Sequence, residues 1–342
     1  MAKKDKVRYA KLIANPGAGK GTEINTKVKL AVRCLEQLGI QTDVALAKPK
    51  EEATPIAEKA AEDGYNIVIA MGGDGTIEAV MRGLVGTKTR LGILPFGTEN
   101  NVAKSLGIPE DIEAACKLIA DAETRKLDIG QVKVKNGPKM YFWELTVVGL
   151  VAALFPEGKK ILKGELSKLK DAADTLLAHE TKSKIFMKMD DDSRVEVETM
   201  LVVVSNTPMF GKNFLVAPTA SLEDGLLDIL VYPDFSKAEL IAYFAAIMDE
   251  GYSENEKVQH YRARKLEIKT KPPLEANADA VDLGKGNMKI RCLPGALRVI
   301  APAPSSPKAF AQEPSNVVPA PLAPPTPKEE EAEPVLADQK EK

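Results

Sequence analysis

The most constraining feature of this sequence is an apolar segment that leads directly into a glycine-rich turn. Residues 66–76 read Asn-Ile-Val-Ile-Ala-Met-Gly-Gly-Asp-Gly-Thr, which predicts a buried strand over Asn66–Met71 and a helix over Ile77–Leu84. The glycines allow backbone amides to approach an anion closely, and the helix N-terminus adds a positive dipole end. An ordinary strand-to-helix turn does not need two adjacent glycines, an acid, a third glycine and a threonine. The segment therefore predicts a phosphate-binding loop.

Strands and helices alternate through the first 127 residues. Besides Asn66–Met71, the apolar patterns predict strands at Tyr9–Ala14, Thr42–Leu46 and Leu91–Leu94, and helices at Thr26–Leu38, Ala53–Glu62 and Ile112–Ala120. Such alternation is typical of a parallel sheet covered by helices on both faces, with ligands bound at the carboxyl ends of the strands. We therefore predict an α/β nucleotide-binding domain over residues 1–127.

The pattern changes to short β-rich segments between residues 128 and 300. The expected strands are Asp128–Val134, Met140–Val148, Lys184–Met189, Val195–Val204, Leu227–Val231, Lys265–Thr270 and Lys289–Arg291, with helical patches at Lys168–Ala178 and Lys237–Met248. Short, partly alternating strands favour antiparallel pairing. We predict a mostly antiparallel β-sandwich domain here.

Residues 301–342 are rich in proline and carry an acidic run at Glu329–Glu331. A segment of this composition cannot bury enough apolar surface to offset its ordering entropy, so we predict a disordered tail. The start of the chain lacks the apolar run of a signal peptide, and no stretch approaches the roughly 20 apolar residues that span a bilayer. These features predict a cytoplasmic protein whose contact with membranes is at most peripheral.

Composition argues against several functional classes. The formal net charge of −2 is unlike that of a general nucleic-acid binder, which carries a basic excess. The cysteines, Cys34, Cys116 and Cys292, have no CxxC spacing and indicate reduced thiols, so neither a zinc site nor a disulfide framework is predicted. With only two histidines, the chain has little material for histidine-based catalysis.

A second loop after a predicted strand resembles the phosphate-binding loop of P-loop enzymes. Residues 15–22 read Asn-Pro-Gly-Ala-Gly-Lys-Gly-Thr. The P-loop pattern requires Gly where Ala14 stands and commonly Ser or Thr where Gly21 stands, although adenylate-kinase-type loops also end Gly-Lys-Gly-Thr. A P-loop small-molecule kinase using Lys20 is therefore an alternative function, but it leaves the β-rich half of the chain unexplained.

A third loop, Leu94–Ala103, reads Leu-Pro-Phe-Gly-Thr-Glu-Asn-Asn-Val-Ala. Thr98 and Asn100 are able to hydrogen-bond a ligand at the strand terminus; alternatively, one of them caps a helical turn that starts near Asn100. In the first loop, the Asp74 carboxylate is suited to Mg²⁺ or to a ribose or phosphate-bound water network. Together the three loops predict a nucleotide site.

Four motifs, in this order, resemble those of the diacylglycerol-kinase-like lipid kinases. They are Asn-Pro-x-x-Gly at Asn15–Gly19, Gly-Gly-Asp-Gly-Thr at Gly72–Thr76, Pro-x-Gly-Thr-x-Asn at Pro95–Asn100, and Pro218 followed by Asp-Gly-x-Leu-Asp at Asp224–Asp228. The resemblance implies an ATP-dependent kinase with an α/β domain, a β-sandwich domain and the active site between them. It also implies that the substrate is the hydroxyl of a lipid such as diacylglycerol or a related glycerolipid.

The resemblance implies roles for individual residues as well. ATP would be bound by Asn15, Gly72, Gly73, Asp74, Gly75, Thr76, Gly97, Thr98 and Asn100. Mg²⁺ would be held by the Asp224 side chain and by the carbonyls of Ser221 and Leu226. The catalytic base of the family lies in a late Asp-Gly-Glu motif, whose best match is Asp279, and Asp74 is the other catalytic candidate.

Several positions depart from the family pattern. Ala280 and Val281 replace the Gly and Glu of the late motif, which makes Asp282 a rival for the base. Glu78 and Ala79 stand where relatives often carry Asn and an acid. Such changes indicate either a subfamily with another acceptor or a non-catalytic nucleotide-binding scaffold. NAD kinase, which has a related fold, fits the second and third loops less well.

A basic amphipathic stretch at Lys159–Lys170 fits either contact with anionic lipid headgroups or a solvated helix face. A solvated face is the commoner case, and a lipid substrate keeps peripheral contact at the inner membrane face as an option. The sequence leaves the oligomeric state open, with a homodimer as one option. It does not identify the acceptor either, because lipid pockets are apolar and tolerant.

Overall fold

The computed structural model describes residues 8–18, 24–48, 52–135, 137–150, 182–190, 192–211, 214–250, 254–279 and 281–303. Several predictions concern residues outside these stretches. They are the role of Lys20, the basic stretch Lys159–Lys170, the helical patch Lys168–Ala178 and the tail beyond residue 303.

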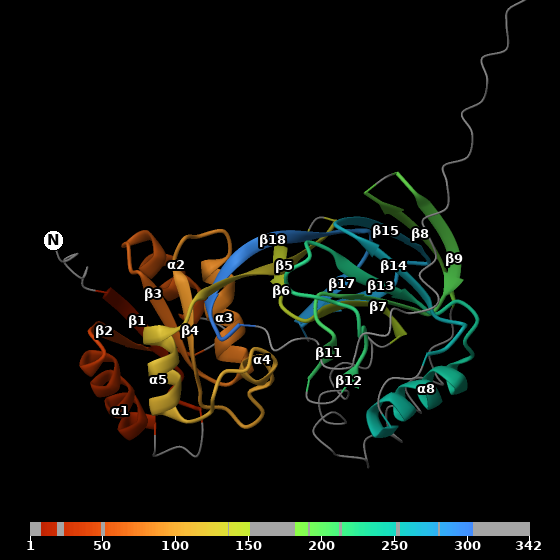
Figure 1. Cartoon of the computed structure of the whole chain (residues 1–342). Coiled ribbons are helices and arrows are strands. Elements are labelled where there is room, and N and C mark those ends of the chain that lie inside the picture. The colour runs from red at the N-terminus through yellow and green to blue at the C-terminus, as the bar shows by residue number, and fades with distance from the viewer. Residues whose placement is uncertain are drawn as a thin grey trace, which may run out of the picture.

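The first domain is a parallel sheet with helices on both faces (Figure 1). Its strands lie in the order β2 (Ile40–Leu46), β1 (Arg8–Ala14), β3 (Ile67–Gly72) and β4 (Arg90–Pro95), and these strands pair in parallel. Helix α2 (Thr54–Glu62) packs with α3 (Asp74–Leu84), and α1 (Ile24–Gln37) packs with α5 (Ile112–Asp121). Each helix pair contributes to a separate buried cluster on the sheet. The α/β prediction is confirmed.

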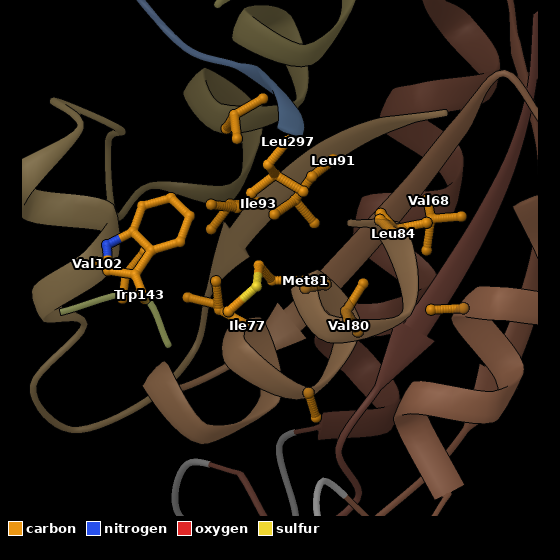
Figure 2. Close-up of a cluster of buried hydrophobic side chains, with 14 of the residues drawn as sticks. Val68, Ile77, Val80, Met81, Leu84, Leu91, Ile93, Val102, Trp143 and Leu297 are labelled. Atoms are coloured by element: carbon orange, nitrogen blue, oxygen red, sulfur yellow. The ribbon is translucent and has the colours of Figure 1, made fainter. Parts of the chain in front are cut away.

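Strand β3 and helix α3 carry the glycine-rich loop between them. β3 is apolar and buried throughout, as expected for a strand covered on both faces. α3 begins at Asp74 rather than at the predicted Ile77, so the loop passes directly into its first turn. Figure 2 shows the cluster in which Ile77 and Leu84 of α3 are buried with sheet residues, and Trp143, from the second domain, lies in the same cluster.

The second domain forms a β-sandwich. One layer of the described structure is a six-stranded antiparallel sheet, in the order β14 (Gln259–Ala263), β13 (Leu227–Val231), β10 (Leu201–Ser205), β7 (Leu145–Gly149), β16 (Glu275–Ala278) and β17 (Val281–Lys285). The other layer contains β15 (Lys265–Lys271), β8 (Ser183–Met189), β9 (Arg194–Thr199), β5 (Thr124–Val134) and β6 (Lys139–Phe142). Side chains of both layers meet in one buried cluster, as in other face-to-face sheets. The predicted antiparallel sandwich is confirmed.

Helix α8 (Lys237–Glu250) lies beside the sandwich, close to the predicted range Lys237–Met248. It packs near the short hairpin of β11 (Met209–Phe210) and β12 (Phe214–Leu215). The rings of Phe244 and Phe214 meet edge to face, with 5.4 Å between their centroids. Within the described stretches, no helix combines the length and apolar character needed to cross a membrane.

One long strand, β18 (Met288–Ile300), joins the two domains into a continuous sheet. It pairs in parallel with β4 at Arg298–Val299 and in antiparallel fashion with β15 nearer its start. β5 runs beside it through both domains (Figure 1). Leu297 lies in the core of the α/β domain, so that domain is not built from residues 1–127 alone. The predicted boundary after residue 127 falls inside β5.

Two predicted strands are each divided between the two layers of the sandwich. Met140–Val148 forms β6 and β7, which separate at Trp143–Glu144, and Val195–Val204 forms β9 and β10, which separate at Met200. In both cases the chain crosses from one sheet to the other. Neither crossing contains a glycine or a proline, so no turn signal in the sequence marks the break.

The folded body extends past the predicted start of the tail. Ala301 is buried in the core of the α/β domain. The Pro302 carbonyl accepts a hydrogen bond of 3.4 Å from the Arg125 guanidinium. Residues 301–303 therefore belong to the first domain, and the tail prediction applies only to the residues after them.

Candidate active site

The predicted nucleotide loops meet at the carboxyl edge of the parallel sheet. Asn15 follows β1 and Phe96 follows β4, and both strands are neighbours of β3, which leads into the Gly72–Thr76 loop. The Asn15 N–H donates to the Met71 carbonyl (3.1 Å), and the Phe96 N–H donates to the Gly72 carbonyl (2.8 Å). These bonds hold the three loops side by side at the edge where parallel sheets bind ligands.

Two glycines bring the first and third loops into direct backbone contact. A Cβ atom at Gly97 would collide with the Cα atom of Gly73, because the two loops leave no space between them. A Cβ atom at Gly72 would collide with the Thr76 hydroxyl, which is buried without a hydrogen-bond partner among the described residues. Closely packed backbone beside an unsatisfied buried hydroxyl fits a cradle for phosphate oxygens.

Asn100 shapes the third loop, and Thr98 is presented on it. Asn100 adopts the left-handed conformation (φ 54°, ψ 41°). Its Oδ1 accepts a hydrogen bond from the Gly97 N–H at 2.8 Å, and its Nδ2 donates to the Gly97 carbonyl at 3.2 Å. Thr98 is exposed, as is Gly75 on the neighbouring loop. Asn100 is therefore engaged in holding the loop, whereas the Thr98 hydroxyl is accessible to a ligand.

The Asp74 carboxylate links the glycine-rich loop to the third loop. Its Oδ1 accepts a hydrogen bond of 2.9 Å from the Val102 N–H in the first turn of α4 (Asn101–Ser105). The helix cap suggested for Thr98 or Asn100 is thus supplied by Asp74. The Asp74 side chain is half-buried, and its Oδ2 has no hydrogen bond to any residue in the described part of the chain. One oxygen fixes the loop, and the other is available to a ligand.

Asp279 lies in the second domain, in the turn between β16 and β17. Its carboxylate accepts hydrogen bonds from three backbone N–H groups, those of Trp143, Glu144 (2.9 Å) and Leu145 (3.1 Å). The side chain is buried, and the backbone is left-handed at φ 42°. Burial raises the pKa of Asp279 above its ordinary value, while the three N–H groups act in the opposite direction. Asp279 therefore holds the crossing between β6 and β7 in place.

Asp282, the rival for the catalytic base, has different surroundings. It lies on β17, and its side chain is exposed. Its Oδ1 accepts a hydrogen bond of 2.7 Å from the Gly284 N–H, within its own turn. Of the two acids in the late motif, only Asp279 is bound to the crossing that carries Trp143 into the first domain.

Glu144 is an acid that sequence reasoning does not single out. Its carboxyl group interacts electrostatically with acidic groups of both domains. The side chain is half-buried, with the Gly211 N–H donating to its Oε1 at 3.4 Å. Burial raises the pKa of Glu144 well above its ordinary value. Three neighbouring acidic groups raise it further: Asp279, Glu78 and Asp74. An acid inside the mainly apolar run 140–150 is the sequence signal that points to this residue.

Arg82 supplies positive charge next to these acids. It lies on α3 and pairs with Glu78 at 3.4 Å. Its Nε donates to the Tyr141 carbonyl of β6 at 3.3 Å. After the larger effects of burial and the backbone N–H groups, its charge also lowers the pKa of Asp279. Helix α3 and the β6–β7 crossing are therefore in contact, with several charged groups between the two domains.

The predicted metal site at Ser221, Asp224 and Leu226 is organised around an arginine. Asp224 Oδ1 accepts a hydrogen bond of 3.0 Å from the Leu226 N–H, and Oδ2 is paired with the Arg262 guanidinium. Arg262 Nε also lies 3.6 Å from a carboxylate oxygen of buried Asp228. These engaged oxygens do not fit a bound divalent cation, so we derive no role for a metal here. In the described stretches, no group of three or more His, Cys, Asp or Glu side chains is placed to hold a metal ion.

Comparisons with known proteins match both domains. The family model described as the diacylglycerol kinase catalytic domain matches residues 9–132, and the model described as the YegS C-terminal NAD kinase beta sandwich-like domain matches residues 159–301. The chain is 25% identical over 303 residues to a diacylglycerol kinase of Mycobacterium tuberculosis, which covers 85% of this chain and 94% of that protein. It is 29% identical over 281 residues to the diacylglycerol kinase of Bacillus subtilis, which covers 80% of this chain and 89% of that protein.

A solved structure has the same fold. It is that of a diacylglycerol kinase from Bacillus anthracis, with a TM-score of 0.65 and 22% sequence identity, covering 87% of this chain and 98% of that one. The two family models follow one another in the same order as the α/β domain and the sandwich. The glycine-rich loop and its sheet lie within the first match, and Asp279 lies within the second. This chain belongs to the diacylglycerol-kinase-like family of lipid kinases.

Proposed function

We propose that this chain transfers the γ-phosphoryl group of ATP to the hydroxyl of diacylglycerol or a closely related glycerolipid. The observation that carries the proposal is the contact between the Gly72–Thr76 loop and Gly97 at the end of the parallel sheet. In the second domain, Asp279 and Glu144 interact electrostatically with charged side chains of α3, the helix that follows this loop. Curated relatives that match over most of their length are named diacylglycerol kinase, and this name guides the choice of acceptor.

The nucleotide would bind with its phosphates over the first turn of α3. Backbone N–H groups of the Gly72–Thr76 loop and the positive end of the helix dipole attract phosphate oxygens. Asn15 and Thr98, at the ends of the flanking strands, complete the set of contacts to ATP. Mg²⁺ accompanies ATP in phosphoryl transfer and neutralises charge on the phosphates. Asp74, with one carboxylate oxygen unengaged in the described structure, is the residue that would contact this ion.

The lipid hydroxyl would enter from the side of the second domain, where Asp279 and Glu144 lie. Phosphoryl transfer depends mainly on positioning and charge neutralisation, and a carboxylate within hydrogen-bond reach of the hydroxyl accepts its proton. Asp279 is the proposed base. Because Asp279 binds the backbone of Glu144, it also fixes the position of the second carboxyl group. Raised pKa values at both residues favour proton exchange nearer neutral pH.

The alternatives differ in their support. The P-loop function that uses Lys20 is not favoured, because residues 9–132 match the diacylglycerol kinase catalytic domain. The non-catalytic scaffold rests on the departures at Ala280 and Val281 and is separated from the kinase by experiment. Peripheral membrane contact through Lys159–Lys170 and a homodimer remain open options.

The deciding experiment is incubation of the full chain with labelled ATP, Mg²⁺ and diacylglycerol in detergent micelles. A total lipid extract is used in a parallel reaction. We expect label in phosphatidic acid, and no label with Asp74→Ala. Label in a different lipid of the extract, but not in the diacylglycerol reaction, would change the proposed acceptor and leave the reaction class intact. ATP binding without any labelled lipid would overturn the kinase proposal and favour the scaffold.

A further inference from the structure

A cavity of about 830 Å³ lies at the edge of the parallel sheet opposite the nucleotide loops. Its lining includes Asn66, just before β3, and Arg90, the first residue of β4, together with residues of α2, α3, β5, β6 and β18. None of the residues assigned to ATP lines it. The volume is in the range of small-molecule sites, roughly 300–1,000 Å³. The cavity is therefore large enough for a ligand of its own.

Basic residues are concentrated on the lining of this cavity. They are Arg82, Lys88, Arg90, Lys126 and Arg298. Arg82 is paired with Glu78. The side chains of the other four make no hydrogen bond or ion pair with any residue in the described stretches. Arg90 and Arg298 are half-buried, and a half-buried cation without a partner is unfavourable. These two arginines therefore favour a bound anion, and the exposed Lys88 and Lys126 add positive charge beside them.

Three of these cations occupy one row across neighbouring strands. Arg298 of β18 is the direct register partner of Arg90 in β4 and of Lys126 in β5. Direct partners point to the same face of a sheet, and like charges in such positions are destabilising. Burial, followed by the charge of Arg8, lowers the pKa of Arg90. Positive charge is therefore crowded at this edge of the sheet.

Neighbouring groups do not neutralise the row. Glu58 and Glu62 of α2 also line the cavity, but they are exposed and make no ion pair with its cations among the described residues. The Arg8 guanidinium is bound to backbone carbonyls, those of Leu38 (2.9 Å) and Ala120 (2.7 Å), rather than to a carboxylate. The net charge around the row is positive.

We propose that this cavity binds a phosphate-bearing anion through Arg90, Arg298 and Lys126. Guanidinium groups bind phosphate with two parallel hydrogen bonds, and a lysine adds a point charge. The cavity has room for the remainder of a small phosphorylated molecule or a lipid headgroup. Helix α3 connects the two sites, from Asp74 at the nucleotide loop to Gly83 on the cavity wall, over about 14 Å. A ligand here is in direct structural contact with the helix that positions ATP.

Titration calorimetry with inorganic pyrophosphate tests this site. The titration is carried out with a saturating ATP analogue, which occupies the nucleotide loops, and wild-type protein is then expected to bind one equivalent of pyrophosphate. Arg298→Gln and Lys126→Gln should each weaken binding by roughly tenfold, because each removes a charge-assisted hydrogen bond. Lys133→Gln removes another exposed lysine of β5 that does not line the cavity, and its affinity should equal that of wild type. The affinity for an ATP analogue should be the same in all four proteins. Equal pyrophosphate affinity in all four, or no binding to wild type, would overturn the proposal.

Thermal melting keeps the test independent of any folding defect. Lys126 is exposed, and its removal relieves repulsion in the row, so ligand-free Lys126→Gln should melt no lower than wild type. Pyrophosphate should raise the melting temperature of wild type more than that of the variant. A lower ligand-free melting temperature with an unchanged pyrophosphate effect would assign the cations to packing and contradict the proposal.

Two sources of the phosphate group are separated by vesicles. Vesicles of phosphatidylcholine with phosphatidic acid are sedimented with each variant, beside vesicles of phosphatidylcholine alone. Co-sedimentation that Lys126→Gln and Arg298→Gln weaken and Lys133→Gln does not would identify a lipid headgroup as the ligand. Pyrophosphate binding with the expected variant pattern, but without such co-sedimentation, would identify a free phosphorylated molecule.

Discussion

Asp74 and Asp279 lie in different domains, and each binds backbone N–H groups of a neighbouring segment. Asp74 is half-buried and uses one oxygen to cap α4. Asp279 is buried and uses both oxygens, for three N–H groups. Asp74 is therefore able to contact a ligand while its loop stays in place, whereas Asp279 reaches a substrate only if some of these bonds are exchanged. Loss of the Asp74 charge should therefore lower mainly the activity, whereas loss of the Asp279 charge should lower both the activity and the free energy of unfolding.

The largest effect is expected for Asp74→Ala. Activity should fall by several orders of magnitude or disappear, because charge aligned with the phosphates is lost. Lys20→Ala, in the segment that resembles a P-loop, should lower activity only about tenfold, or about 1.4 kcal/mol. Steady-state kinetics with ATP and diacylglycerol measure both variants. The reverse ranking would favour the P-loop function.

Asp279→Asn is expected to have the next largest effect. The substitution retains shape but removes the proton acceptor, so turnover should fall by roughly 10²–10⁴ with little change in ATP affinity. It also leaves one carbonyl oxygen for the three backbone donors, so the free energy of unfolding should fall by about 1–3 kcal/mol. Kinetics, ATP titration and urea denaturation measure the three quantities.

Asp282→Asn is the matched control, three positions along the same motif. Its side chain is exposed and bound only to the Gly284 N–H within the described residues, so activity and stability should stay close to wild type. An inactive Asp282→Asn beside an active Asp279→Asn would place the base at Asp282. The contrast between Asp74 and Asp279 would then no longer apply.

Glu144→Gln should give a smaller effect that depends on pH. The folded-state pKa of Glu144 is raised, so its protonated form contributes stability below the unfolded value of about 4.3. This contribution is lost as the pH rises through the folded-state pKa. Glutamine stays neutral, so the melting temperature of the variant should gain on that of wild type as the pH increases from about 4 to about 8. A difference that is constant across this range would show that the folded-state pKa of Glu144 is not raised.

The smallest effect is expected far from both aspartates. Truncation after Ala303 should leave the melting temperature and ATP affinity unchanged, because residues of that composition contribute little to a core. Truncation after Ile300 removes buried Ala301 and the Pro302 carbonyl that binds Arg125, so it should lower the melting temperature. Differential scanning calorimetry compares the two. Equal melting temperatures would show that residues 301–303 do not support the first domain.

The sequence predicts those parts of the site that depend on local pattern. The strand before Gly72 and the helix after it are recognisable from a short window, and parallel strands bring their carboxyl ends together without further information. The gathering of Asn15, the Gly72–Thr76 loop and Gly97 follows from these rules. The structure adds that positions 73 and 97 need glycine, because the two loops approach each other too closely for a side chain.

Contacts between distant segments were not accessible to the same reasoning. The N–H groups that bind Asp279 come from residues 143–145, so its structural role has no local signature. Glu144 resembles an exposed residue of a strand unless the crossing between sheets is known. Arg262 pairs with Asp224 across the fold, and the Asp-Gly-x-Leu motif gives no indication of this partner.

The position of β18 has a consequence for the way in which this chain is made. β4 and β5 are synthesised early, but their shared partner leaves the ribosome only after the whole β-sandwich. Until then the edge of β4 lacks its partner, and unpaired edges recruit strands of other chains. Pairing between such distant segments is also slow. The α/β domain therefore cannot complete its sheet until β18 has been synthesised, and the nascent chain depends on protection from aggregation until then.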